Sequence, residues 1–108
     1  MEPSFYPEII QIDDLTINPV ANEVRVHGTP LKLTRKEFQI LWAVGSNPEK
    51  VFHRNELLML VWGSEVSVEP RTVDAHMARL RKILSAHNLE SPKIETIWGI
   101  GYRLRPRN

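Results

Sequence analysis

The residues best suited to chemistry lie on one predicted helix, PRTVDAHMARLRKIL, at positions 70–84. At about 100° per residue, four apolar side chains fall in one narrow sector of this helix: Val73, Met77, Leu80 and Leu84. The opposite side holds Arg71, Ala75, Ala78, Arg79 and Lys82, with Thr72 and Arg81 on its flanks. The pattern predicts a helix that packs on a core by one stripe and presents a cationic surface, where two alanines let a partner come close.

Arginine and threonine on such a surface can recognise phosphates or the edges of bases. The fork of an arginine matches the O6 and N7 acceptors of guanine, and Arg79 is central on the outer face. A phosphate contact or a solvated side chain is the alternative for Arg79. Thr72 could donate to a phosphate or touch a thymine methyl, with helix capping as its rival role. Phosphate neutralisation is expected of Arg71, Arg81, Lys82, Arg103 and Arg105, although Arg81 could instead pair with Asp74 or Glu95.

The remaining chemistry-bearing residues do not form a catalytic or metal-binding pattern. The chain has no cysteine, so disulfides, zinc thiolates and thiol nucleophiles are excluded. Its four histidines lie on separate predicted elements without metal-ligand spacing, and His76 is expected to be half-buried and bonded to a phosphate or to backbone. No GxSxG motif or glycine-rich phosphate loop is present. We therefore expect neither an enzyme nor a bound cofactor or metal.

Charge is distributed unevenly along the 108 residues, although the formal net charge is only +1. Residues 1–70 hold six Lys/Arg against ten Asp/Glu, whereas residues 71–108 hold eight against three. This asymmetry favours a polyanion-binding second half, with chance segregation as the alternative. The acidic start of the chain does not resemble a signal peptide, and no apolar run is long enough to span a membrane, so we expect a cytoplasmic protein without membrane contact.

The other elements follow from alternation, caps and turn residues. Short strands are predicted at residues 8–12, 15–17, 23–26 and 31–33, separated by Asp, Asn, Gly and Pro. A first helix begins after Thr34, where TRKE forms a capping box, and stops at Asn47-Pro48. A second helix opens at His53 or Arg54 and ends at Trp62-Gly63; Trp42 and Trp62 are expected in the core, although the Trp62 indole could instead reach a phosphate.

The chain ends in a predicted β-hairpin with strands at residues 94–98 and 102–105 around Gly99-Ile100-Gly101. Arg103 and Arg105 should share one face of it, with Tyr102 and Leu104 on the other. The predicted fold class is α+β: an N-terminal antiparallel sheet, three helices and a C-terminal hairpin. In this order a cationic helix can enter a major groove while the hairpin, or wing, reaches phosphates or the minor groove.

Four motifs in this order resemble the winged helix-turn-helix effector domain of OmpR/PhoB-type response regulators. They are LKLTRKEFQIL at residues 31–41, LLMLVWG at 57–63, RTVDAHMARLRKIL at 71–84 and IETIWGIGYRL at 94–104. Any one of them would be a weak signal, but four at matching spacing are specific. The resemblance covers the chain from about Ile9 to Arg105.

The resemblance implies a DNA-binding transcription regulator of a two-component phosphorelay, with residues 1–7 as a tail or linker, residues 8–106 as the domain, and the receiver domain outside this chain. It implies double-stranded DNA with direct-repeat half-sites, bound by head-to-tail pairs. The implied DNA-binding residues on the recognition helix, about 70–86, are Arg71, Thr72, Ala75, His76, Arg79, Arg81 and Lys82. Those in the wing, 94–105, are Thr96, Trp98, Tyr102 and Arg103. The implied RNA polymerase contact loop is Gly63, Ser64, Glu65, Val66 and Ser67.

Two residues depart from the family pattern. Ala78 and Trp98 stand where basic residues are common, and the residue at the place of Trp98 usually probes the minor groove. Trp98 could instead pack on sugars, wedge shallowly into the groove, or turn back onto the domain. A protein-interaction module that uses the wing or the 63–69 loop is the alternative function.

Overall fold

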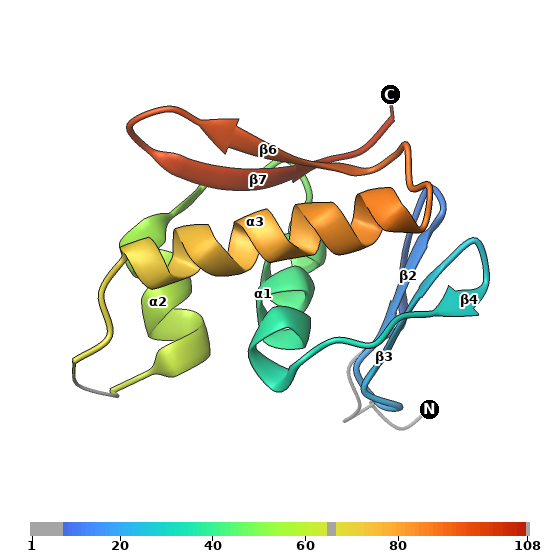
Figure 1. Cartoon of the computed structure of the whole chain (residues 1–108), viewed down its shortest axis with the longest axis horizontal. Helices are drawn as coiled ribbons and strands as arrows, with labels where there is room; N and C mark the ends of the chain where they lie inside the picture. Colours follow the sequence, from blue (N-terminus) through green and yellow to red (C-terminus); the bar gives the residue numbers. More distant parts are fainter. Residues whose placement is uncertain (1–7, 65–66, 108) are drawn as a thin grey trace, which may run out of the picture.

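The computed structural model of the chain describes residues 8–64 and 67–107. Its elements surround one core in which α3 lies against α1 and α2 and beside the hairpin of β6 and β7 (Figure 1). The architecture confirms the predicted α+β class and element order. The elements are β1 (Ile10–Ile12), β2 (Leu15–Asn18), β3 (Glu23–Val26), β4 (Thr29–Pro30), α1 (Arg35–Ser46), β5 (Phe52–His53), α2 (Arg54–Trp62), α3 (Arg71–Ala86), β6 (Lys93–Ile97) and β7 (Gly101–Arg105).

The N-terminal sheet is an antiparallel meander in the order β1-β2-β3-β4. One of its faces is apolar and buried, through Ile12, Leu15, Ile17, Val24 and Val26. The prediction of a last strand at residues 31–33 was wrong. His27 and Gly28 both have positive φ, as a two-residue hairpin turn requires, so Thr29 already lies opposite Val26. Strand β4 ends at Pro30, and the last backbone hydrogen bond to β3 runs from Leu31 N–H to the carbonyl oxygen of Val24 at 2.9 Å.

Local sequence signals set the helix boundaries. Thr34 Oγ1 accepts from the backbone N–H of Glu37 at 3.2 Å, and Glu37 Oε1 accepts from the backbone N–H of Thr34 at 2.8 Å, which confirms the capping box of α1. Helix α3 runs from Arg71 to Ala86, which agrees with the predicted recognition helix at about 70–86. The four side chains of its apolar stripe are all buried, which confirms the face by which α3 is anchored.

The two helical tryptophans differ in burial. Trp62 is buried, as predicted. Trp42 is only half-buried at the edge of the core, where its ring packs 6.0 Å from that of Phe38. The core therefore includes the end of α2 fully and the outer side of α1 only in part.

A second sheet holds the wing to the helices, in the strand order β5-β7-β6. The short strand β5 pairs Phe52 with Tyr102 and His53 with Gly101. Gly101 has no room for a side chain, since an added Cβ would lie 1.9 Å from the carbonyl oxygen of Phe52. Because that oxygen belongs to a paired strand and cannot move aside cheaply, close backbone approach at Gly101 fixes the base of the wing.

Replacing Gly101 by alanine should therefore destabilise the domain by about 3 kcal/mol, because strand β5 must separate from β7. Urea unfolding of both variants would measure this cost against Gly45→Ala. At Gly45 the one close contact of an added Cβ is with the end of the Ile17 side chain, at 2.6 Å, and this side chain can rotate; Ile12 and Leu104 lie at an ordinary 3.9 Å. Alanine also favours the helix. Equal losses in the two variants would contradict the constraint at Gly101.

Candidate nucleic-acid interface

The outer side of α3 is open and cationic, as its sequence predicts. Exposed residues on this side are Arg71, Ala75, Ala78, Arg79 and Lys82, while Thr72 and Arg81 are partly buried on the flanks. Arg71 also pairs with Glu69 at 2.6 Å, but both side chains remain largely exposed. The surface can therefore accept an anionic partner along most of the helix.

Arg79 is held by a carboxylate buried beneath α3. Its Nε lies 2.9 Å from Oε2 of Glu37, a residue of α1 whose side chain is 1% exposed, whereas the Arg79 side chain is 67% exposed. The other oxygen of Glu37 accepts from the N-cap backbone of α1. A buried carboxylate needs such partners to offset its lost hydration, and here they join the start of α1 to the middle of the exposed face of α3.

Thr72 and His76 are joined within the first turns of α3. The Nδ1–H of His76 donates to the carbonyl oxygen of Thr72 at 2.8 Å, so the backbone interaction expected for this half-buried histidine is present. Its ring meets Trp62 edge-on, with centroids 5.1 Å apart. Thr72 is the second residue of the helix, and Pro70 occupies the N-cap, so the capping role considered for Thr72 was wrong.

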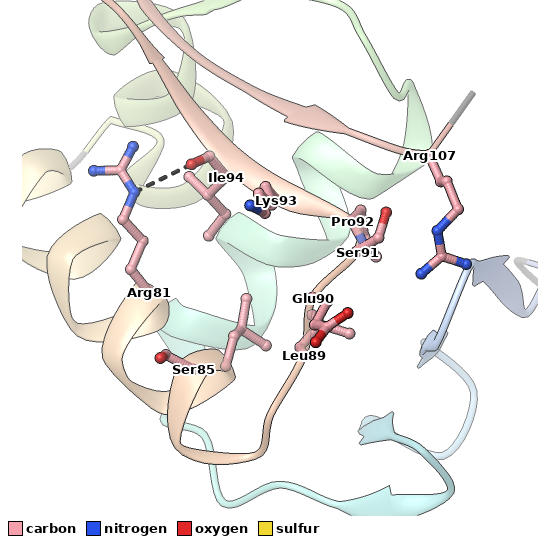
Figure 2. A pocket seen from close by; sticks show the side chains of 10 residues that line it. Arg81, Ser85, Leu89, Glu90, Ser91, Pro92, Lys93, Ile94 and Arg107 are labelled. Atoms are coloured by element: carbon pink, nitrogen blue, oxygen red, sulfur yellow. Dashed lines mark hydrogen bonds between the residues drawn. The ribbon is translucent and has the colours of Figure 1, made fainter.

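Arg81 connects α3 to the wing. Its Nε donates to the carbonyl oxygen of Ile94 at 3.2 Å, its Nη2 donates to Oγ1 of Thr96, and its guanidinium lies 5.6 Å from the centre of the Tyr102 ring. Figure 2 shows Arg81 reaching the backbone of β6 at the edge of a hollow of about 680 Å³, which continues past Ser91 to Arg107. The considered pairing of Arg81 with Asp74 or Glu95 was wrong, since these carboxylates bond other residues.

Asp74 ties α2, α3 and the wing together from inside the interface. One of its oxygens accepts from the Tyr102 hydroxyl at 2.6 Å, and the other pairs with Arg54 Nη2 at 2.7 Å. Burial, followed by the hydrogen bond to Asp74, raises the pKa of Tyr102 to about 12. Tyr102 is thus a neutral donor that fixes the wing relative to α3.

The arginines of the last strand face away from α3. Glu95 pairs with Arg103 Nε at 2.5 Å and with Arg105 Nη1 at 3.1 Å, and these arginines, chiefly Arg103, hold the pKa of Glu95 below its usual range. Tyr102 and Leu104 are buried on the opposite side of the hairpin, as predicted. Arg103 and Arg105, which were predicted to neutralise phosphates, therefore lie on another face than the cations of α3.

The tip of the wing is apolar and projects into solvent. Trp98 is 89% exposed and Ile100 is 44% exposed, so the considered orientation of Trp98 back onto the domain was wrong. The backbone N–H of Ile100 donates to the carbonyl oxygen of Ile97 at 2.9 Å, and Gly99 has a φ of 78°. This is the pattern of a four-residue turn with glycine at its third position.

The loop that follows α2 is only partly described. Gly63, Ser64 and Ser67 are exposed, and Gly63 and Ser67 have positive φ. Glu65 and Val66, which were also predicted to belong to this contact loop, lie outside the described residues. The described part of the loop leads into the N-terminal end of α3 (Figure 1).

Within residues 8–64 and 67–107, no group of three His, Cys, Asp or Glu side chains is placed to hold a metal ion. None of the helices in this part of the chain is both long and apolar enough to cross a membrane. The exposed cationic face of α3 and the tip of the wing are thus the features that suggest a partner.

Comparison with known proteins identifies the family. A family model described as "Transcriptional regulatory protein, C terminal" matches residues 28–104. The chain belongs to this family. The predicted OmpR/PhoB-type winged helix is thereby confirmed, and the family is one of regulators, which agrees with the expectation that the chain is not an enzyme.

Similar proteins of known sequence agree with this family. The chain is 37% identical over 107 residues to the phosphate regulon regulator PhoB of Klebsiella pneumoniae, covering 99% of this chain and 46% of PhoB. It is 41% identical over 97 residues to the regulator YclJ of Bacillus subtilis, covering 89% of this chain and 42% of YclJ. The chain therefore spans less than half the length of these relatives.

One structural neighbour is the RstA DNA-binding domain of Klebsiella pneumoniae, solved in complex with the RstA box. It superposes with a TM-score of 0.80 at 30% identity and covers 94% of this chain and 100% of that domain. The winged-helix architecture of this OmpR/PhoB-type domain is thus shared with a domain solved on DNA.

Two parts of the site were not predicted from the sequence. Glu37 was recognised only as a capping residue, although its second oxygen holds Arg79. Arg54 was recognised only as a helix start, although it pairs with Asp74. Both contacts join residues at least 20 positions apart, and neither has a local sequence signal.

Alkaline pH should weaken this domain through Tyr102. The folded state raises its pKa from 10.0 to about 12, so the stabilisation is complete below pH 10 and is lost as pH rises toward 12. Urea unfolding should show a steeper loss between these pH values for the natural protein than for Tyr102→Phe. Identical pH slopes would contradict the contact with Asp74, since the lysines titrate in both proteins.

Arg79→Ala should destabilise the domain by about 2 kcal/mol, because Glu37 stays buried without its cationic partner. Arg71→Ala removes a solvent-exposed pair and should cost less than about 0.5 kcal/mol. Urea unfolding gives both values. In a Glu37→Gln background the cost of Arg79→Ala should nearly vanish, and an undiminished cost there would show that the ion pair is not its source.

Proposed function

We propose that this chain is the DNA-binding effector domain of a response regulator, which controls transcription by placing α3 in the major groove and the wing at the adjacent minor groove. The observation that carries the proposal is the open cationic face of α3, with Arg79 at its centre held by the buried Glu37. The family and the DNA-bound RstA structure support it.

Arg79 reads a base in this proposal. Glu37 engages the Nε side of the guanidinium, and the side chain remains 67% exposed. The two terminal nitrogens can then donate to the O6 and N7 of a guanine. Because Glu37 restricts the rotamers of Arg79 before binding, less conformational entropy is lost when the contact forms.

Phosphate contacts set the register of α3 on the duplex. Arg71 supplies exposed charge at its N-terminal end and Lys82 supplies it in the C-terminal half. Thr72 lies in the first turn, where the positive end of the helix dipole favours anions, and His76 lies one turn further along. The small side chain of Ala75, between Thr72 and His76 and the rest of the exposed face, lets the DNA backbone come close to the helix. Arg81 holds Thr96 and the wing in place through two of its N–H groups, which donate to Ile94 and Thr96, and its remaining N–H groups can meet a phosphate.

The whole regulator extends beyond this chain. In the proposal, residues 1–7 form a tail or linker, residues 8–106 form the effector domain, and a receiver domain lies in the remaining length found in the relatives.

Head-to-tail pairs of this domain bind direct repeats of DNA in the cytoplasm. The loop at residues 63–67 contacts RNA polymerase, for which the exposure of Gly63, Ser64 and Ser67 is the structural support.

Selection of bound sequences from a random duplex pool tests this function. We expect an enriched direct repeat with half-sites about one helical turn apart. With about five phosphates neutralised, log affinity should fall against log salt with a slope of roughly −4 to −5. No enrichment and a slope near zero would contradict DNA binding and favour the protein-interaction module.

Arg79→Lys should lose about 1 to 3 kcal/mol of discrimination at one G·C pair of the selected site, because lysine keeps the charge beside Glu37 but lacks the fork. Lys82→Ala is the matched control: it should weaken all sequences alike and lower the salt slope by about 1. Affinities for single-substitution duplexes measure both effects. Uniform weakening by Arg79→Lys would assign Arg79 to phosphate instead.

A further inference from the structure

We propose that the wing tip recognises the minor groove as an apolar wedge, with Trp98 entering beside a flexible base step and bending the duplex. This inference rests on the proposed function and adds a mode of sequence selection to it. Residues 96–101, TIWGIG, contain no charged side chain, so electrostatic readout by the tip itself is excluded. The most exposed large apolar side chain of the described residues is Trp98.

The tip is held rigidly, which a wedge requires. The hydrogen bond from Ile100 to Ile97 closes the turn, and Gly101 fixes the return strand against Phe52. Arg81 donates to Thr96 on the outgoing strand. A tryptophan on a fixed turn can be inserted without first losing the freedom of a flexible loop.

The wing tip lies across a hollow from the recognition helix, and this hollow can hold one strand of the DNA backbone. A hollow of about 410 Å³ lies between them, lined by Arg54, Asp74 and Arg81 on the helical side and by Trp98 and Ile100 on the wing side. A sugar-phosphate strand that separates a major groove occupied by α3 from the next minor groove must pass between these two elements. The two arginines in the hollow suit that strand, and they place Trp98 at the groove beyond it.

The two arginines of β7 do not offer an alternative reader of the minor groove. Arg103 and Arg105 pair with Glu95 on the opposite side of the hairpin. The contact made by the tip is therefore apolar, with Ile100 beside the indole. Apolar side chains that enter the minor groove unstack base steps and kink the duplex, and pyrimidine–purine steps such as TA deform most easily.

The test compares wild type, Trp98→Ala, Trp98→Phe and Trp98→Arg on the selected duplex and on variants at the minor-groove step. Affinity, duplex bending by energy transfer between end labels, and unstacking by 2-aminopurine fluorescence are measured. Wild type should prefer a TA step over a stiff A-tract and bend it, and Trp98→Ala should lose about tenfold of that preference together with the bend. Trp98→Phe should retain most of both.

Trp98→Arg should instead favour the narrow groove of an A-tract, because that groove attracts arginine. Trp98 is almost fully exposed, so none of these changes should lower the unfolding temperature. If wild type binds and Trp98→Ala keeps the same step preference and bend, the wedge is wrong while DNA binding stands. If wild type binds no duplex in a salt-dependent manner, the proposed function fails and the wedge fails with it.

Discussion

The buried carboxylate of Glu37 is the interaction on which the arrangement of the binding face depends. One oxygen closes the N-terminus of α1 and the other meets Arg79 from below. An ionised group at 1% exposure is costly unless both oxygens are satisfied. The same contact that stabilises the first helix therefore sets the direction of the central arginine of the third helix.

A second set of contacts fixes the wing relative to α3. Asp74 accepts from Tyr102 and pairs with Arg54, Arg81 spans from α3 to β6, and the absence of a side chain at Gly101 brings β7 against β5. These contacts are polar or depend on close backbone approach, unlike the apolar stripe that seats α3 on the core. The apolar stripe determines which side of α3 is exposed, whereas the polar contacts determine where the wing tip lies relative to it.

Much of the fold could be predicted because its signals are local. The capping box at Thr34, the apolar spacing from Val73 to Leu84 and the glycines of the hairpin each act within a few residues, and the structure contains the corresponding helices and turn. The position of β4 was missed because the turn is confined to His27 and Gly28, which both have positive φ, so the next strand already begins at Thr29. The sequence shows an excess of positive charge after Pro70, but it does not show how that charge is distributed over the surface. Arg103 and Arg105 pair with Glu95, on a different face from the cations of α3.

Of the candidate site, the sequence identified the exposed residues of α3 but not the groups beneath them. The link between Glu37 and Arg79 crosses 42 positions of the chain, and only packing of α1 against α3 brings the two together. The exposure of Trp98 likewise depended on how the turn at Gly99 directs the tip, which spacing alone left open among three orientations. In both cases the function assigned to a residue depends on a neighbour that is remote in sequence.

In the proposed function, the buried carboxylate of Glu37 positions Arg79 to read a base. A double-mutant cycle with Glu37→Gln and Arg79→Lys, measured as discrimination between the selected site and its variant at the base pair assigned to Arg79, tests it most directly. Glu37→Gln should reduce this discrimination while Arg79 is present, and it should have no further effect once lysine replaces Arg79. Unchanged discrimination in Glu37→Gln, or strictly additive effects of the two substitutions, would contradict the claim.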